Sequence, residues 1–190
     1  GGATETMVIM EGFGRGLVLE PFFGTVVLGA NLILQAGNEA QKVDLLPNLA
    51  QGGLKLAFAY AERQARFDLH DVETKAEKSS DGYTINGAKG VVFGAASADK
   101  IIVAARTSGD SRDTEGITLF FVDSDATGVS RRDYTTNDAL RASEISFENV
   151  QVGASAVLGD VDGGHAVIER VAEFAVAALC AGAVGCMDIL

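Results

Sequence analysis

The sequence predicts an α+β, multidomain chain: a helical segment, then a middle antiparallel β-barrel or β-sandwich, then a long helix. Three different residue patterns along the 190 residues predict this order. Residues 4–51 look helical, residues 54–159 consist of short β-rich runs between turn signals, and residues 163–190 are apolar around most of a helix. We therefore expect three domains or parts of domains, covering residues 1–53, 54–160 and 161–190.

The N-terminal segment is predicted to form three helices. Apolar side chains at helical spacing place the first at residues 4–15 and the second at residues 21–35, which begins with a proline in its first turn. Asn38, with Gln41 three residues later, is typical of a capping box and predicts the start of a third, short helix. We expect Pro47 to disturb the end of that helix, because proline has no backbone N–H to donate.

The middle segment is rich in β-branched and aromatic residues. Asp81-Gly82 separates two such runs and predicts a β-hairpin, and Asn86-Gly87 predicts a second turn soon after it. Many short strands with turns between them indicate a sandwich or barrel. The strand candidates are residues 74–78, 83–85, 101–105, 117–122, 143–147 and 150–152.

The last segment predicts one long helix that is buried on several sides. Its apolar residues cover most of the helix circumference, from Ala166 to Leu179 and beyond. The β-rich segment alone offers too little surface to cover such a helix. We therefore expect its packing partners further along the natural polypeptide or on another subunit, and we expect the chain to be a fragment.

Composition limits the possible partners and compartment. The formal net charge of −11 argues against nucleic acid and against an anionic membrane surface, because both require clustered basic side chains. Cys180 and Cys186 lie on different faces of the predicted helix, so we expect no disulfide between them. The N-terminus lacks a signal-peptide pattern, and a reducing, cytoplasmic setting fits these features.

Four stretches of the sequence follow one another in a distinctive order. Residues 37–62 read GNEAQKVDLLPNLAQGGLKLAFAYAE, and residues 81–107 read DGYTINGAKGVVFGAASADKIIVAART. Residues 118–129 read TLFFVDSDATGV, and residues 146–168 read SFENVQVGASAVLGDVDGGHAVI. Together they resemble the acyl-CoA dehydrogenase family, from the end of its N-terminal helical domain to the helix that follows its β-domain.

This resemblance implies a particular part of a larger fold. The chain would hold part of the N-terminal helical domain, the whole middle β-domain and the first helix of a C-terminal four-helix bundle. It would lack the first N-terminal helices and most of the C-terminal domain. Residues 61–72, AERQARFDLHDV, look most like the branch called pimeloyl-CoA dehydrogenase small subunit.

The chemistry that the resemblance implies is oxidation of a saturated acyl-CoA to the trans-2-enoyl-CoA. A carboxylate removes the α-proton while a hydride leaves Cβ for N5 of FAD. Such a site must desolvate the base and stabilise the charge that develops on the thioester oxygen. The family also implies an electron-transfer flavoprotein as the acceptor, and a homo- or hetero-oligomer built as a dimer of dimers.

The resemblance places the cofactor beside two strands. The positions that match the family's flavin-facing residues are Phe58, Tyr60, Ala61, Val91 and Phe93. Hydroxyl side chains and a tryptophan that are common at these positions in the family are missing here, so backbone amides would have to hold the ring. Ordinary β-core packing is the alternative role for these residues.

Two further positions match contacts to the substrate, and no position matches the catalytic base. Phe67 stands where the family usually has a serine near the thioester and pantetheine, and Glu173 matches an acidic position near the CoA chain. A solvated helix residue is the alternative role for Glu173. Some members place the catalytic glutamate at the position of Ala175, which cannot act as a base, so we expect the base outside this chain.

No other sequence pattern predicts a functional site as specifically as this resemblance does. His70 and His165 lack the spacing of metal ligands and are predicted to be surface or loop residues. Three hypotheses therefore compete. The first is an FAD-dependent acyl-CoA dehydrogenase. The second is a partner subunit of a hetero-oligomeric dehydrogenase that has lost its flavin contacts. The third is an isolated β-module that binds an apolar ligand or another protein.

Overall fold

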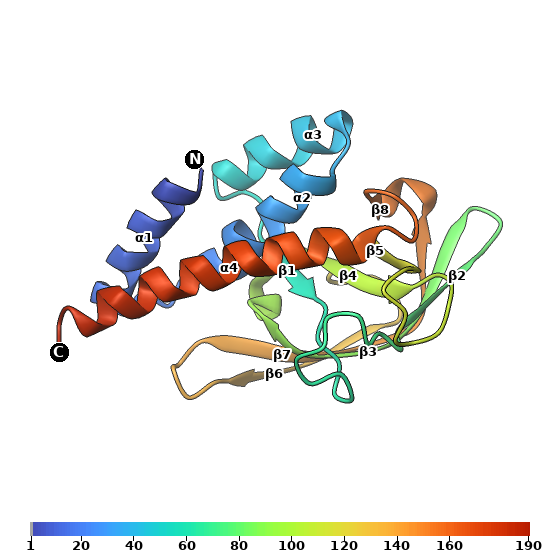
Figure 1. The fold of residues 1–190 in the computed structure, drawn as a ribbon. Coiled ribbons are helices and arrows are strands. Elements are labelled where there is room, and N and C mark those ends of the chain that lie inside the picture. Colours follow the sequence, from blue (N-terminus) through green and yellow to red (C-terminus); the bar gives the residue numbers. More distant parts are fainter. Residues whose placement is uncertain (1) are drawn as a thin grey trace.

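The computed structural model describes residues 2–190 and has helices at both ends and strands between them (Figure 1). A π-helical stretch, η1, runs directly into α2, so the predicted second helix is confirmed with an unusual winding at its start. The helices are α1 (Ala3–Gly16), η1 (Phe23–Ala30), α2 (Asn31–Ala36), α3 (Glu39–Ala50) and α4 (Gly164–Met187), with short 3₁₀ turns η2 (Ala95–Ser97) and η3 (Ala154–Ala156).

The strands form one sheet in the order β6-β7-β3-β2-β4-β5-β8, and β1 pairs in parallel with β4. The sheet is strongly folded but not closed, so the expectation of a barrel is corrected. One end of the order is β6, whose sequence VSRRDYT is charged and mostly exposed, as suits an edge strand. The strands are β1 (Leu56–Ala59), β2 (Lys75–Lys78), β3 (Gly82–Phe93), β4 (Lys100–Arg106), β5 (Ile117–Asp123), β6 (Val129–Thr135), β7 (Arg141–Gly153) and β8 (Val157–Leu158).

Two hydrophobic cores lie on the two faces of the central strands. Side chains alternate across a strand, so Ile102 of β4 packs toward the helices while Ile101 and Val103 pack into the second core inside the folded sheet. The same alternation turns Phe58 of β1 toward the helices. Because β1 and β4 are buried on both faces, their sequences are apolar without alternation.

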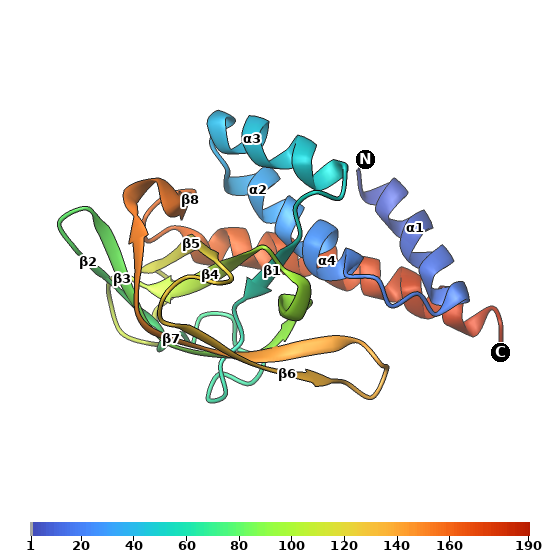
Figure 2. The same cartoon turned by 180° about the vertical axis from the view of Figure 1, so that it is seen from behind.

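The long helix α4 lies along the helix-covered face of the sheet, with α1 beside its C-terminal half (Figures 1 and 2). The two helices approach closely at glycines. A Cβ atom on Gly14 would lie 2.0 Å from the carbonyl oxygen of Gly182, and one on Gly185 would lie 2.0 Å from that of Glu11. The crossing of α1 and α4 therefore depends on small residues from both helices. None of the helices within residues 2–190 combines the length and apolar character needed to cross a bilayer.

Two local expectations from the sequence are confirmed and two are wrong. Asn38 and Gln41 form the expected capping box of α3, and β2 and β3 form the expected hairpin. Asn86-Gly87 is not a turn: β3 continues through it with a β-bulge, and Gly87 adopts a φ of 149°. Nor does α3 end at Pro47; it continues to Ala50.

Candidate functional site

A second irregularity of β3 lies where the resemblance places the flavin. Pairing of β3 with β7 shifts between Lys89 and Val92, so Gly90 and Val91 form a β-bulge. Val91 adopts a φ of 51° and is 49% exposed, and a Cβ on Gly90 would meet no atom within 4 Å. The amide of Gly90 donates to the carbonyl oxygen of Ala61, 2.9 Å away. The bulge therefore turns an apolar side chain and an open stretch of backbone toward solvent beside Ala61.

An inner cavity separates the wall formed by β1 from α4. Its volume is 130 Å³, and it is lined on the sheet side by Phe58 and Tyr60, whose rings are 5.0 Å apart. On the α4 side it is lined by Ala175 and its neighbours Val171 and Val176. Burial raises the pKa of the Tyr60 phenol, which therefore stays protonated at neutral pH. Of residues 2–190, none with a carboxylate side chain lines this narrow apolar slot.

A larger space, which we call the aromatic cleft, continues along α4 beyond the inner cavity. Its volume is 720 Å³, and Phe13, Phe22, Phe23 and Phe93 line it. Residues 137–140 at the tip of the β6–β7 hairpin form another wall, and both views show this hairpin extending beneath the C-terminal half of α4. Phe93 therefore lies in the cleft, whereas Phe58 and Tyr60 line the inner cavity.

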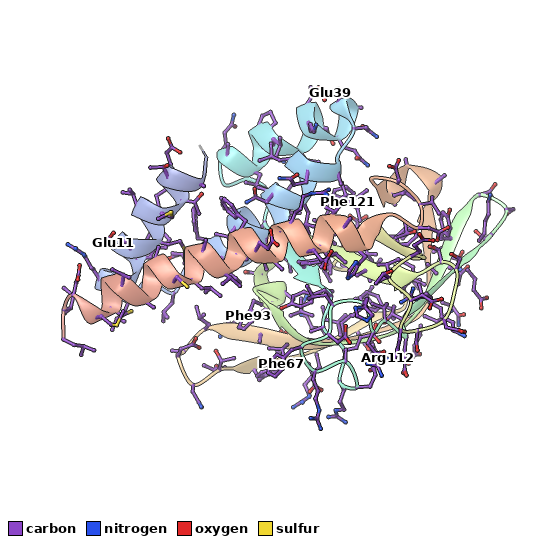
Figure 3. The ribbon with its side chains drawn as sticks, in the orientation of Figure 1. Glu11, Glu39, Phe67, Phe93, Arg112 and Phe121 are labelled. Atoms are coloured by element: carbon purple, nitrogen blue, oxygen red, sulfur yellow. The ribbon has the colours of Figure 1, made fainter. Side chains whose placement is uncertain are left out.

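The structure places the two predicted substrate residues outside both spaces. Phe67 is 98% exposed on the loop after β1, at the lower side of the molecule in Figure 3. Glu173 lies on the exposed side of α4. Neither lines the inner cavity or the aromatic cleft. Contacts between these residues and a CoA chain therefore stay a prediction.

Sequence reasoning missed a buried ion pair directly beneath the bulge. The Nζ atom of Lys89 lies 2.7 Å from Oε1 of Glu62, and the two side chains are 0% and 3% exposed. Glu62 also accepts hydrogen bonds from the amides of Glu73 and Thr74 and from the Gln64 side chain. The pair thereby ties the chain after β1 to β3. Its signal in the sequence was a lysine and a glutamate within otherwise apolar runs.

A second missed feature organises the loops beside the cavity. Arg106, 6% exposed at the end of β4, donates to five backbone carbonyl oxygens of two loops. The acceptors are His70, Val72, Ser111, Asp113 and Glu115.

The loop that carries His70 packs this residue against His165 in the first turn of α4, a pairing that the spacing in the sequence did not predict. His70 and His165 lie edge to face with their ring centroids 5.5 Å apart. Each ring also has a carboxylate near Nδ1, Asp68 at 2.8 Å and Glu169 at 3.6 Å. Among the described residues, no three metal-binding side chains gather into a cluster.

The ion pair predicts a specific loss of stability in acid. Burial works to raise the pKa of Glu62, but the charge of Lys89 and the hydrogen bonds to the carboxylate outweigh it, so this pKa is lowered. A carboxyl whose folded-state pKa lies below its unfolded value near 4.5 stabilises the fold above that pH. The contribution is lost as the pH falls toward the folded-state pKa.

Replacing Glu62 with Gln is therefore expected to cost about 2–3 kcal/mol at pH 7 and progressively less below pH 4.5. Urea unfolding of the wild-type chain and E62Q across this range measures the difference. Glu77→Gln, at an exposed position of β2, serves as the matched control. It should leave unchanged the fall in the free energy of unfolding below pH 4.5. A difference between wild type and E62Q that stays constant with pH would contradict this account.

Comparison with known proteins identifies the family. Residues 57–150 match the family model described as "Acyl-CoA dehydrogenase, middle domain". A probable medium-chain specific acyl-CoA dehydrogenase of Caenorhabditis briggsae is 33% identical over an alignment of 197 positions. The alignment covers 97% of this chain and 48% of that protein. A short-chain specific acyl-CoA dehydrogenase of Megasphaera elsdenii is 36% identical over 140 residues, covering 72% of this chain and 36% of that protein.

Solved structures agree with the sequence matches. Butyryl-CoA dehydrogenase from Megasphaera elsdenii superposes with a TM-score of 0.86 at 30% identity, covering 94% of this chain and 48% of that one. The chain thus spans about half the length of the structure and of the first relative it matches. The order of helices and strands, the β-domain model and these relatives agree: the chain belongs to the acyl-CoA dehydrogenase family.

Proposed function

We propose that the protein containing this chain is an FAD-dependent acyl-CoA dehydrogenase that oxidises a saturated acyl-CoA to the trans-2-enoyl-CoA. The observation that carries the proposal is the apolar inner cavity between the β1 wall and α4, next to the open bulge of β3. Family membership supplies the reaction class, and the cavity supplies a water-poor slot of the kind that the chemistry needs.

The residues around the bulge fit a flat cofactor ring that is held by backbone and apolar contacts. Val91 is half exposed, Gly90 leaves open space, and Ala61 lies beside both through the 2.9 Å hydrogen bond. Their side chains offer no hydrogen-bonding group, so polar recognition of the ring would fall to main-chain atoms. The chemistry supplied by bound FAD is acceptance of the hydride from the β-carbon.

The side chains of this chain would prepare the substrate rather than exchange protons with it. Phe58, Tyr60 and Val171 give the cavity an apolar lining, and an apolar setting raises the pKa of a carboxylate base placed within it. Ala175 in the cavity wall carries no proton acceptor. We therefore assign the base to the part of the protein outside these 190 residues.

Two further elements of the proposal rest on the family alone: an electron-transfer flavoprotein as electron acceptor, and assembly as a dimer of dimers. The pimeloyl-CoA dehydrogenase small-subunit-like branch is proposed from residues 61–72. The cytoplasmic setting and the domain boundaries after residues 53 and 160 are proposed from composition and sequence pattern. Cys180 and Cys186 are both free thiols in the structure.

The direct test uses the purified full-length protein. It is expected to be yellow, and its flavin colour should bleach when a suitable acyl-CoA is added without oxygen, with a 2-enoyl-CoA as the product. Mass spectrometry of the thioester checks the loss of two hydrogen atoms. A colourless protein that does not take up added FAD would contradict the proposal.

The second candidate function is a non-catalytic partner subunit of a hetero-oligomeric dehydrogenase. The observation that favours it is the absence of polar side chains at Ala61, Val91 and Phe93, around the expected flavin position. Activity that appears only after mixing with a second, co-purifying dehydrogenase subunit would support this alternative, and a fully active homo-oligomer would exclude it. The isolated β-module is disfavoured, because the structural match covers helices and strands over 94% of the chain.

A further inference from the structure

The aromatic cleft is built from two edge-to-face pairs of phenylalanines. Phe13 of α1 and Phe22 lie 5.2 Å apart with their planes at 72°, and Phe23 of η1 and Phe93 of β3 lie 6.4 Å apart at 88°. Three of the rings come from residues 13–23, and the fourth, Phe93, comes from β3, 70 residues further along the chain. Rings arranged in this way offer both faces and edges to a further ring, which is the contact geometry that aromatic groups prefer.

The cleft is wide as well as apolar. On α4 it extends from Leu179 to Cys186, a rise of about 10 Å along a helix. A volume of 720 Å³ over that length corresponds to a mean cross-section of about 70 Å². This is far wider than a single extended methylene chain, which would leave much of the cleft unfilled and lose contacts with its walls.

The cleft is also continuous with the inner cavity of the candidate site. Phe23 and Leu179 line both spaces. From Ala175 in the inner cavity to Leu179, which lines both spaces, α4 rises about 6 Å. A group bound at Ala175 would therefore need a spacer of several carbon atoms, about one helical turn long, to place its end in the cleft. At the crossing of α1 and α4, where Gly14 meets Gly182, the two helices close one side of the cleft.

The charged groups around the cleft limit which end group of a ligand can bind there. Its ionisable lining residues include two carboxyl groups, Glu20 and Asp138, and no lysine, arginine or histidine of residues 2–190 lines it. A carboxylate at the far end of an acyl chain would approach these two like charges, which disfavours it, whereas Arg141 lines only the adjoining space. The cleft therefore suits a neutral end group.

We propose that the acyl group of the substrate carries a neutral aromatic ring a few carbons beyond the thioester, and that this ring binds in the aromatic cleft. The inference rests on the acyl-CoA dehydrogenase function proposed above and names the substrate class of that site. It assigns Phe13, Phe22 and Phe23 as residues that determine specificity, while Phe93, at the position expected to face the flavin, bounds the cleft on the sheet side. It also predicts discrimination against dicarboxylic acyl groups, including the pimeloyl group that the sequence branch suggested.

The test compares three thioesters on the full-length holoprotein: 5-phenylpentanoyl-CoA, hexanoyl-CoA and pimeloyl-CoA. Dissociation constants from calorimetry and the extent of anaerobic flavin bleaching are measured for each. The phenyl compound is expected to bind at least about ten-fold more tightly than hexanoyl-CoA. Pimeloyl-CoA should bind most weakly of the three.

The matched variants are Phe22→Leu in the cleft and Phe121→Leu outside it. Phe121 lies toward the N-terminal end of α4, away from Phe93 (Figure 3). F22L should reduce the preference for the phenyl compound over hexanoyl-CoA by about five-fold, and F121L should leave that ratio unchanged.

Equal losses for both thioesters in F22L, or wild-type preference for hexanoyl- or pimeloyl-CoA, would overturn the inference while leaving the proposed function intact. Failure of all three thioesters to bind would overturn both.

Discussion

Replacing Lys89 with Met is expected to lower the free energy of unfolding by about 3–5 kcal/mol, because it leaves the Glu62 carboxylate buried without its counter-ion. Lys89 is fully buried, and burial lowers the pKa of its ammonium group to about 8 although the charge of Glu62 works in the opposite direction. Near neutral pH the lysine is therefore mostly charged, and the pair holds two opposite charges in an apolar setting.

Urea unfolding of the chain measures this loss, and two further variants make the result specific. The double variant E62Q/K89M is expected to lose less stability than K89M alone, because it removes both charges together. Lys78→Met, at an exposed position of β2, is the control and should change stability by less than about 0.5 kcal/mol. A double variant that is as unstable as the sum of the single variants would show that the two side chains do not act as a pair.

The second large effect is expected at Arg106, whose replacement by Met should cost about 3 kcal/mol. The change removes donors from five carbonyl oxygens in one step, and buried acceptors without a partner are costly even when water replaces part of the loss. Because those carbonyls belong to the loops around residues 68–73 and 108–116, both loops should loosen together.

Hydrogen exchange of the backbone amides separates this local effect from a general loss of stability. The amide of Val72 donates to the Ser111 carbonyl at 2.8 Å and joins the two loops, so its protection should fall more in R106M than that of amides in β5. Arg132→Met is the control, since Arg132 is exposed on the edge strand β6 and pairs with Glu144. A uniform loss of protection across the whole sheet would contradict the expectation that Arg106 mainly holds these two loops together.

Features set by neighbouring residues were predictable from the sequence. The capping box needs only Asn38 and Gln41, and the β2–β3 hairpin needs only Asp81-Gly82 between two β-rich runs. The same local logic failed at Asn86-Gly87, because pairing with β7 kept β3 extended and absorbed the extra residue as a bulge. It also missed β6, whose charged residues lack an apolar face and pair only with β7.

The candidate site could be predicted only in part, because it depends on contacts between distant residues. Only the family resemblance pointed to Phe58 and Tyr60, which line the inner cavity in the structure, whereas strand alternation favoured ordinary core packing for them. The pairing of Glu62 with Lys89, and that of His70 with His165, arise from tertiary packing that no sequence spacing encodes. The aromatic cleft likewise combines Phe13 with Phe93 across 80 residues of chain.

The parallel pairing of β1 with β4 has a consequence for the order of events during synthesis. Leu56–Ala59 align with Lys100–Val103, and β4 is the one strand within residues 2–190 that pairs with β1. At about 5–20 residues per second, β1 and the helical stretch packed on it wait roughly 2–10 s for β4 to emerge from the ribosome. In that interval the apolar side chains of η1 and β1 have no sheet to cover them. Nascent chains halted before residue 100 should therefore recruit chaperones more strongly than chains halted after β5.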